Sequence, residues 1–517
     1  MLIKNGTIID GTGEKRYKAD IRIKDGVIEE IKKDLKERSG EETISAAGAY
    51  VTPGFVDILN HSDAFATIFE NPAQESLLRQ GITTILMGNC GSSLAPLKDA
   101  VFINSIQKWG DPSKININWL TMKEYLSELE RHKFGVNIAT LAGHSTIRRG
   151  FVGSEPRMLT GEEMRKMEYM INNALNEGAF GVSVGLAYAH GNPADGKELR
   201  MVMETVKNYN ALFSAHIRDE SKDFKHSVEE IIQLARETGA NTEFSHLKVS
   251  GENSKDKYSE ALDALADKEN INFDIYPYTT TASVLYSFLP DWAKEGGNMT
   301  LLDNLKLSGF KQKLVQEMKN DSYSYKDMIV AMGDMNPSYY GKTIEDIAKN
   351  QETDPEEAAL NLITASENRV IVFAKTISDE NLKLAMQHPK SIVSSDGVGY
   401  KEEDSERKEY VHPRYFGAFP RFINKYVKEE KLLSLEDAIK KTTLVPAEKI
   451  GFKNRGKIAK GYNADIVILD RKKLKDNSTF EDPYHYPDGV KYVLVNGEVA
   501  VEKGELKELA GEVLKAR

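Results

Sequence analysis

The chain has 517 residues, of which 40% are hydrophobic and 29% are charged, with a formal net charge of −10 and a pI near 5.7. This composition is typical of a globular protein, and the acidic balance argues against nucleic acid as a partner because phosphate binding needs a basic surface. The length exceeds the usual size of one hydrophobic core, so we expect one large domain and one smaller domain.

The first residues, MLIKNGTIIDGTG, predict a strand and a turn rather than a targeting segment. No apolar run reaches about 18 residues, the length at which a segment becomes a candidate membrane span. We therefore expect a cytoplasmic protein that has no membrane partner.

Both ends of the chain alternate apolar and polar residues between tight turns, which is typical of short antiparallel strands. Near the C-terminus, Asn496-Gly497 has the composition of a hairpin turn. The segments with this pattern are LIKNGTIIDGTG (2–13), DIRIKDGVIEEI (20–31), ADIVILD (464–470) and VKYVLVNGEVAVEKGE (490–505). We predict that residues 1–50 and 453–517 together form one small β-sandwich domain.

Between these ends, residues 51–452 contain short apolar runs separated by amphipathic stretches, such as 160–178 and 226–239, that have the periodicity of helices. Strands and helices that alternate about eight times predict a (β/α)8 barrel of the TIM type. Nine candidate strands are present, so one is surplus. Either NFDIYPY (272–278) or RVIVFA (369–374) should lie outside the barrel wall.

Residues from about 284 to about 345 form a long, irregular and aromatic segment. It is longer than a normal barrel loop needs. We interpret it as an insertion over the mouth of the active site that acts as a lid, and the alternative is a purely structural excursion.

Five potential metal ligands lie where predicted strands end. They are His61, Cys90, His216, His246 and Asp396. A single buried His or Cys is usually structural, but the catalytic groups of such barrels gather at the C-terminal ends of the strands, so these five should converge. Cys90 is the only cysteine, which excludes an internal disulfide and leaves its thiol free, buried, reactive or bound to a metal.

Thiolate and imidazole are donors that suit Zn²⁺, and three protein ligands with one open position are typical of a catalytic zinc site. Zinc lowers the pKa of a water ligand to about 7, so a nucleophile is available at neutral pH. Asp396 is placed to take a proton from this water and to pass it to a leaving nitrogen. This pattern predicts the hydrolysis of an amide.

Nine motifs follow one another over nearly the whole chain: GNCGSSLAP (88–96), GHSTIR (143–148), GAFGVSVGLAY (178–188), AHIRDE (215–220), SHLK (245–248), YPY (276–278), SSDG (394–397), HPRYFGAFPRF (412–422) and GYNADIVILD (461–470). In these motifs the chain resembles the N-acyl-D-amino-acid deacylases, or D-aminoacylases, of the amidohydrolase superfamily. The glycine-framed cysteine is similar to that of this family and is uncommon elsewhere in the superfamily, where a carboxylated lysine usually bridges the metals.

The resemblance implies that Cys90, His216 and His246 hold one tightly bound zinc ion and that Asp396 is the catalytic acid and base.

It also implies that the substrate carboxylate is gripped by Lys248, Tyr276 and Arg414. A guanidinium can bind a carboxylate through two parallel hydrogen bonds, which suits this task. For Lys248 and Arg414, the alternative is a role in ordinary salt bridges. A hydroxyl of the family falls at Ala282 or Ser283, so Ser283 is a further candidate contact.

Two positions depart from the family pattern. The family's HxHxD becomes LNHSD, so Leu59 replaces the first histidine and a second zinc would have only His61, Asp396 and a share of Cys90. We expect that second site to be weak or absent and His61 to be an auxiliary ligand. The family's YPPG becomes YAHG, and we interpret its His190 as an incidental loop residue rather than a replacement ligand.

The leading hypothesis is a zinc-dependent amidohydrolase that cleaves small N-acyl amino acids, of D configuration by resemblance, to a carboxylate and a free amino acid. One alternative is a cyclic-amide hydrolase similar to dihydroorotase or hydantoinase, or an isoaspartyl dipeptidase. Another is a metal-poor homologue without turnover, as Leu59 would suggest, although the other candidate ligands are all present. No motif predicts an oligomeric state.

Overall fold

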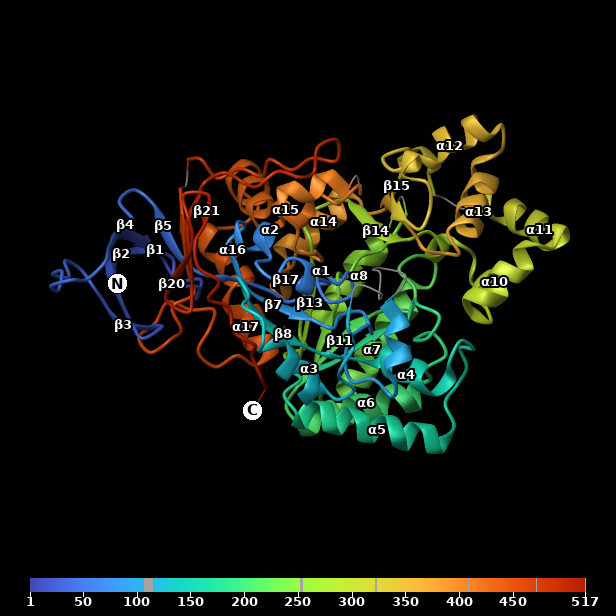
Figure 1. The fold of residues 1–517 in the computed structure, drawn as a ribbon, viewed down its shortest axis with the longest axis horizontal. Coiled ribbons are helices and arrows are strands. Elements are labelled where there is room, and N and C mark those ends of the chain that lie inside the picture. Colours follow the sequence, from blue (N-terminus) through green and yellow to red (C-terminus); the bar gives the residue numbers. More distant parts are fainter. Residues whose placement is uncertain (107–114, 252–253, 321–322, 408, 471, 517) are drawn as a thin grey trace.

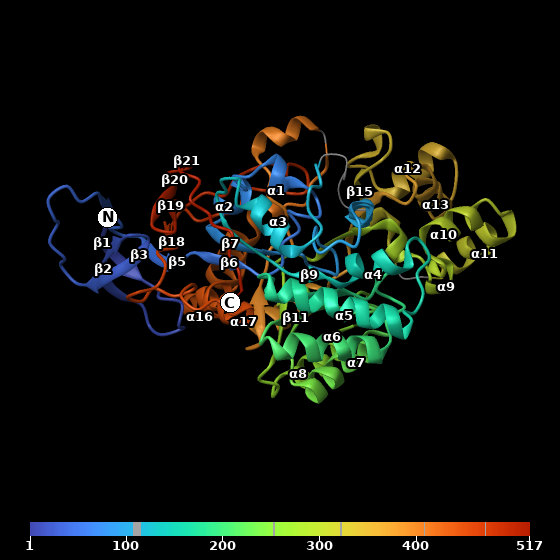
Figure 2. The same cartoon turned by 60° about the horizontal axis from the view of Figure 1, so that its bottom comes forward.

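The computed structural model describes residues 1–106, 115–251, 254–320, 323–407, 409–470 and 472–516. A sheet built from both chain ends lies at one side of a central barrel, and a helical excursion lies at the other side (Figures 1 and 2). Among the described residues, no helix is long and apolar enough to cross a membrane.

The terminal sheet combines the two ends of the chain, as predicted. Its members are β1 (Leu2–Ile8), β2 (Tyr17–Lys24), β3 (Val27–Lys32), β4 (Thr43–Ser45), β5 (Tyr50–Pro53), β18 (Ile466–Leu469), β19 (Val490–Val495), β20 (Glu498–Glu502) and β21 (Glu505–Leu506). The described strands follow the order β21-β20-β19-β18-β5-β1-β2-β3, and β4 pairs with β1. β18 and β5 join the two ends in antiparallel register, with Val467 opposite Thr52. We retain 1–50 and 453–517 as the proposed bounds of this domain.

The barrel strands pair in parallel around a closed ring. They are β6 (Phe55–Asp57), β7 (Ile82–Met87), β8 (Asn137–Thr140), β9 (Ala142–Gly143), β10 (Gly181–Gly185), β11 (Leu212–His216), β12 (Asn241–Phe244), β13 (Ile271–Ile275) and β17 (Ser391–Val393). One residue separates β8 from β9, so these two form one side of the ring: β8 pairs with β7 and β9 with β10. A parallel bridge between Asn60 and Gly397 joins the ends of β6 and β17. The predicted (β/α)8 fold is confirmed.

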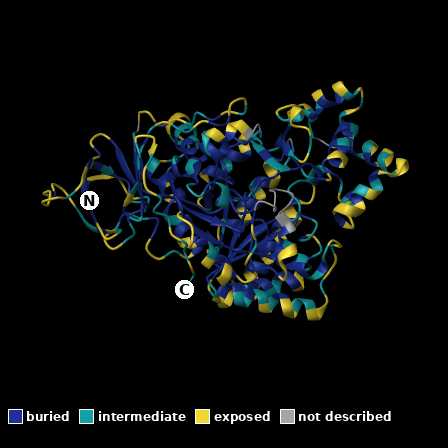
Figure 3. Ribbon diagram, viewed as in Figure 1, coloured by how far each residue is buried: buried dark blue, intermediate teal, exposed yellow. Residues whose placement is uncertain are grey.

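Helices surround the barrel. They are α1 (Thr67–Glu70), α2 (Glu75–Leu78), α3 (Met122–Leu129), α4 (His144–Val152), α5 (Gly161–Asn176), α6 (Gly196–Asn208), α7 (Phe224–Thr238), α8 (Lys255–Leu265), α14 (Asp379–Gln387), α15 (Arg414–Arg421), α16 (Leu435–Thr442) and α17 (Leu444–Ile450). Local sequence explains their bounds: α5 begins with a capping box between Thr160 and Glu163 and buries Met167 and Ile171 on one face. Exposed residues lie on the outer faces of these helices, whereas the strands are buried (Figure 3).

The excursion leaves the barrel after β13 and returns before α14. It contains β14 (Thr280–Val284), α9 (Asp291–Lys294), α10 (Gly297–Leu305), α11 (Ser308–Met318), β15 (Met328–Gly333), α12 (Ile344–Gln351), α13 (Pro355–Ala365) and β16 (Val370–Lys375). The surplus strand is RVIVFA, because it forms β16 of an antiparallel sheet, while NFDIYPY supplies β13 of the barrel. The insertion predicted at about 284–345 lies within this excursion, and the core of the excursion includes Cys90 and Tyr188 from the barrel mouth.

Candidate active site and metal centre

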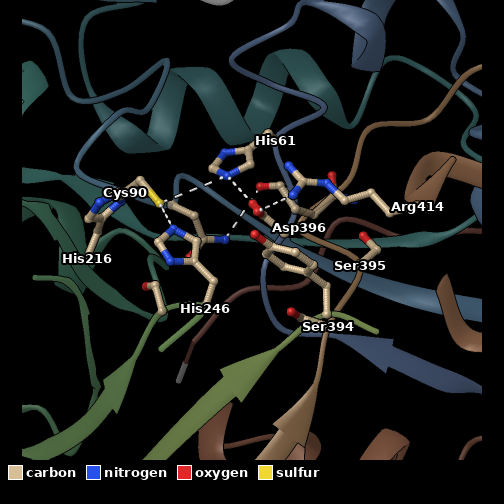
Figure 4. Close-up of polar contacts among 12 residues, drawn as sticks. His61, Cys90, His216, His246, Ser394, Ser395, Asp396 and Arg414 are labelled. Atoms are coloured by element: carbon tan, nitrogen blue, oxygen red, sulfur yellow. Dashed lines mark hydrogen bonds and ion pairs between the residues drawn. The ribbon is translucent and has the colours of Figure 1, made fainter. Parts of the chain in front are cut away.

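The five strand-end residues predicted to converge do lie around one cavity. This cavity has a volume of about 340 Å³, and its lining includes His61, Cys90, His216, His246 and Asp396. His216 is the last residue of β11, the other four side chains come from loops that follow β6, β7, β12 and β17, and Figure 4 shows all five pointing toward one another. The other wall comes from the excursion, through residues such as Phe288, Trp292 and Tyr323.

Three of these residues form a cluster that can hold a metal ion. The ligand atoms of Cys90, His216 and His246 all lie within 4.8 Å of one another, and all three residues are buried. The Cys90 Sγ lies 3.5 Å from His246 Nε2, and the imidazoles of His216 and His246 meet edge to face. Among the described residues, none is a hydrogen-bond partner of His216 Nδ1. One thiol and two imidazoles are a donor set that suits a soft or borderline metal ion, so the residues present fit a metal cofactor.

Burial disfavours the charged forms of two residues of this cluster. It raises the pKa of the Cys90 thiol and lowers the pKa of His216, because each charged form loses hydration inside the protein. A bound cation reverses this for the thiol, since a coordinating thiol is deprotonated.

The backbone at the site is strained. Cys90, His246 and Asp396 have φ angles of 51°, 36° and 45°, a region that non-glycine residues rarely adopt. Each follows the end of a barrel strand by two or three residues. Such conformations cost on the order of 1–3 kcal/mol each and concentrate at functional sites. There they give a side chain a direction that an unstrained backbone would not allow.

Asp396 is buried between a histidine and an arginine. Its Oδ1 lies 3.0 Å from His61 Nε2, and its Oδ2 lies 2.8 Å from Arg414 Nη1. Burial raises the pKa of Asp396, but the charge of Arg414 and the hydrogen bond with His61 outweigh burial and hold the pKa well below its usual range. Asp396 is therefore ionised and able to accept a proton. His61 Nε2 also lies 4.0 Å from Cys90 Sγ, which places this histidine between the cluster and the carboxylate.

Of the residues predicted to hold the substrate carboxylate, three line the cavity and Tyr276 lies behind Arg414. Lys248, Arg414 and Ser283 line the cavity, and Ser283 Oγ lies 3.0 Å from Ser287 Oγ. Tyr276 is fully buried; its ring centroid lies 4.6 Å from the Arg414 Cζ, and its hydroxyl hydrogen-bonds the hydroxyl of Thr281. Tyr276 thus contacts Arg414 directly.

Glu220 is a site residue that the motif reasoning missed. Its Oε1 lies 2.6 Å from Lys248 Nζ, 3.3 Å from His246 Nδ1 and 3.6 Å from His216 Nε2. Burial raises the pKa of Glu220, but the charge of Lys248 and the two histidines outweigh burial and lower it. The motif AHIRDE could have indicated this residue, because Glu220 follows the strand-end His216 by four positions.

The two unusual positions of the sequence lie outside the ligand cluster. Leu59 is fully buried and belongs to an apolar cluster with Val56 and Leu86. His190 lines a different cavity, and its Nε2 donates a hydrogen bond to the carbonyl oxygen of Gly153.

The family model described as "Amidohydrolase family" matches residues 411–501. The N-acyl-D-glutamate deacylase of Alcaligenes xylosoxydans xylosoxydans is 30% identical over 100% of this chain and 96% of its own length. The chain belongs to the N-acyl-D-amino-acid deacylase family.

Two solved structures support this deacylase assignment. The N-acyl-D-glutamate deacylase of Bordetella bronchiseptica, complexed with zinc and a phosphonate mimic of the tetrahedral intermediate, is 28% identical, with a TM-score of 0.82 over 100% of this chain and 99% of that chain. A D-aminoacylase structure that addresses one-metal activation and second-metal attenuation in a binuclear centre is 25% identical, with a TM-score of 0.82 over 99% of both chains. The family predicted from the motifs is confirmed, and the deacylase site includes a metal cofactor.

Proposed function

We propose that this protein is a zinc-dependent amidohydrolase that cleaves the amide bond of N-acyl-D-amino acids and releases a carboxylate and a free amino acid. The observation that carries the proposal is the buried cluster of Cys90, His216 and His246 beside an ionised Asp396 in one cavity. The full-length similarity to N-acyl-D-glutamate deacylase supports the same reaction class.

We propose one tightly bound zinc, held by Cys90, His216 and His246. His61 is already engaged with Asp396, and Leu59 offers no donor atom where the family has its first histidine. Any second metal would therefore compete with the hydrogen bond between His61 and Asp396, which supports a weak or absent second site.

Zinc bound at this cluster supplies a Lewis acid that activates water and polarises the amide carbonyl. Asp396 then accepts the proton of the attacking water, because Arg414 keeps the carboxylate ionised. The same carboxyl group, once protonated, donates to the leaving nitrogen. His61 fixes the orientation of Asp396 through Oδ1 and leaves the other oxygen to Arg414.

Lys248 and Arg414 supply the positive charge for the substrate carboxylate, with Ser283 as a hydroxyl donor. Tyr276 holds the Arg414 guanidinium against its ring, a cation–π contact that limits how the arginine can turn. Glu220 holds Lys248 at 2.6 Å and lies 3.3 Å from His246 Nδ1, so it contacts a proposed substrate residue and a proposed metal ligand together.

A hydrolysis screen tests the proposed function. Zinc-loaded protein is assayed with paired N-acetyl-D- and N-acetyl-L-amino acids, and with dihydroorotate and hydantoins as cyclic substrates. We expect turnover of the linear D compounds. Hydrolysis of the cyclic amides alone would replace the proposal with a cyclic-amide hydrolase, and no turnover by a zinc-loaded protein would support a homologue without catalysis.

A further inference from the structure

A second cavity adjoins the active site and has no role in the chemistry described above. Its volume is about 620 Å³. It lies between α4, the loops after β7 and β10, and the excursion. The excursion packs closely on the barrel here, because a Cβ added at Gly297 of α10 would lie only 2.8 Å from Pro156. Tyr188 and Lys294 line both cavities, and the Tyr188 ring packs edge to face on His216 with centroids 5.0 Å apart.

Arg149, in the last turn of α4, supplies an unpaired positive charge to this second cavity. Within the described part of the chain, its guanidinium forms no hydrogen bond and no ion pair, and burial lowers its pKa. The other cations that line the cavity have carboxylate partners: Lys294 with Asp291, Lys306 with Asp303, and Arg369 with Glu367. A half-buried charge without a partner is costly, so an anion in the cavity would be stabilised by Arg149.

A buried hydroxyl at this cavity also lacks a partner. Ser145 Oγ has no hydrogen-bond partner among the described residues. Ser145 precedes Arg149 by one helical turn on α4, so both side chains lie on the same face of the helix. A hydroxyl beside a guanidinium matches an oxyanion, and Leu301 and Leu302 of α10 add an apolar wall beside these groups.

We propose that the second cavity binds a carboxylate carried on a short aliphatic chain, with Arg149 as its counter-ion and Ser145 as a hydrogen-bond donor. Two sources have this chemistry: the far end of a dicarboxylic acyl group on the substrate, or a free dicarboxylate. The acyl group is the source that the geometry favours, and this part rests on the proposed function. Figure 4 shows Cys90 and His216 on one side of Asp396 and Arg414 on the other. A substrate whose α-carboxylate meets Arg414 would extend its acyl group toward Tyr188, which borders the second cavity.

Calorimetric titration of the full-length protein with succinate tests the site directly. Succinate can also meet Arg414 and Lys248 in the first cavity, so dependence on Arg149 is the deciding result. We expect saturable binding to the wild type and to Lys306→Met, a control whose charge in the same cavity is already paired, and binding weaker by roughly tenfold or more in Arg149→Met. Arg149→Lys, which keeps the charge, should recover part of the affinity.

Kinetics separate the two sources. If the carboxylate belongs to the acyl group, Arg149→Met should lower kcat/KM for an N-succinyl-D-amino acid by roughly tenfold and leave the N-butyryl analogue unchanged. If the ligand is a free dicarboxylate, Arg149→Met should weaken succinate binding without changing the ratio between these two substrates.

Equal succinate affinity in the wild type, Arg149→Met and Arg149→Lys, together with an unchanged substrate ratio, would overturn the proposal. If neither N-acyl compound is hydrolysed by zinc-loaded protein, the proposed function fails, and the succinate titration still decides whether the second site exists.

Discussion

Arg414 Nη1 lies 2.8 Å from Asp396 Oδ2, and both residues are buried at the end of the barrel where the metal-capable cluster lies. The pair explains how a carboxylate without solvent remains ionised, because the guanidinium outweighs the effect of burial on its pKa. It also couples substrate binding to proton transfer, since we assign Arg414 to the substrate carboxylate and Asp396 to the reacting proton.

Replacing Arg414 should change the pH dependence of activity. Arg414→Met removes the charge that lowers the pKa of Asp396, so this pKa should rise and the acidic limb of kcat/KM should move to higher pH. Arg414→Lys keeps a charge and should move the limb less. The measurement is a pH profile of kcat/KM for each variant; the same acidic limb in all three proteins would assign that limb to another group.

Asp396→Asn should retain zinc and lose most turnover. The amide keeps the shape of the side chain but cannot accept the proton, a role that typically contributes about 10²–10⁴-fold in rate. Zinc content by elemental analysis and kcat on an N-acetyl-D-amino acid check this. A variant with normal zinc content and a normal rate would move proton transfer to a different residue.

Cys90→Ala should abolish both tight zinc binding and amidase activity, because we propose Cys90 as one of the three zinc ligands and its Sγ belongs to the buried cluster that can hold a metal. Removal of zinc from the wild type with a chelator should have the same effect on activity, and added zinc should restore it in the wild type alone. Full zinc content and full activity in Cys90→Ala would show that the metal lies elsewhere.

Leu59→His restores the imidazole that the family has at this position. It should raise the zinc content above one ion per chain, since position 59 precedes His61 by two residues at the end of β6 and is where the family has its first histidine. Equilibrium dialysis against zinc measures the stoichiometry, with Leu59→Gln as a polar control of similar length. An unchanged stoichiometry in Leu59→His would show that this position does not control the second site.

Glu220→Gln should weaken zinc binding by roughly 10- to 100-fold, because Glu220 contacts His246 and outer-sphere carboxylates of this kind orient metal ligands. It should also raise KM, since Lys248 loses its 2.6 Å partner. Glu229→Gln on the exposed face of α7 is the matched control. Zinc competition with a chelator and steady-state kinetics give the two readouts; an unchanged zinc affinity would reduce Glu220 to a partner of Lys248 alone.

Two residues of the GHSTIR motif, His144 and Arg148, pair with the buried carboxylate of Glu198 and should stabilise the folded protein. This buried carboxylate lies 2.7 Å from His144 and 2.6 Å from Arg148 of the GHSTIR motif, and these partners outweigh burial and lower its pKa to about 2. The depressed pKa means that the stabilisation is complete above the unfolded value of about 4.5 and is lost as the pH falls through about 2.

Glu198→Gln should therefore lower the free energy of unfolding by about 3 kcal/mol at pH 7, because it leaves Arg148 buried without a counter-ion. Urea unfolding of both proteins between pH 7 and pH 3 measures this. The difference between wild type and variant should shrink as the pH falls; a constant difference would show that the charge of Glu198 is not what stabilises the fold.

Local sequence determined the alternation of strands and helices, the short strands at both chain ends, and the strand-end positions of Cys90, His216, His246 and Asp396. These features follow from hydrophobic periodicity and from the rule that parallel strands of a barrel end on one face, so no knowledge of distant contacts is needed. The motifs also indicated the family, which the full-length similarity confirmed. The roles assigned to single site residues stay predictions.

Only the tertiary structure decided which contacts form between residues far apart in the chain. RVIVFA has the same local pattern as a barrel strand, and its antiparallel partners β14 and β15 place it in the excursion. Glu220 meets Lys248 and His246 because two loops converge, and Arg149, without a partner among the described residues, lines the cavity between α4 and the excursion. Pairing of this kind depends on the three-dimensional path of the chain, and the periodicity of a single segment carries no information about it.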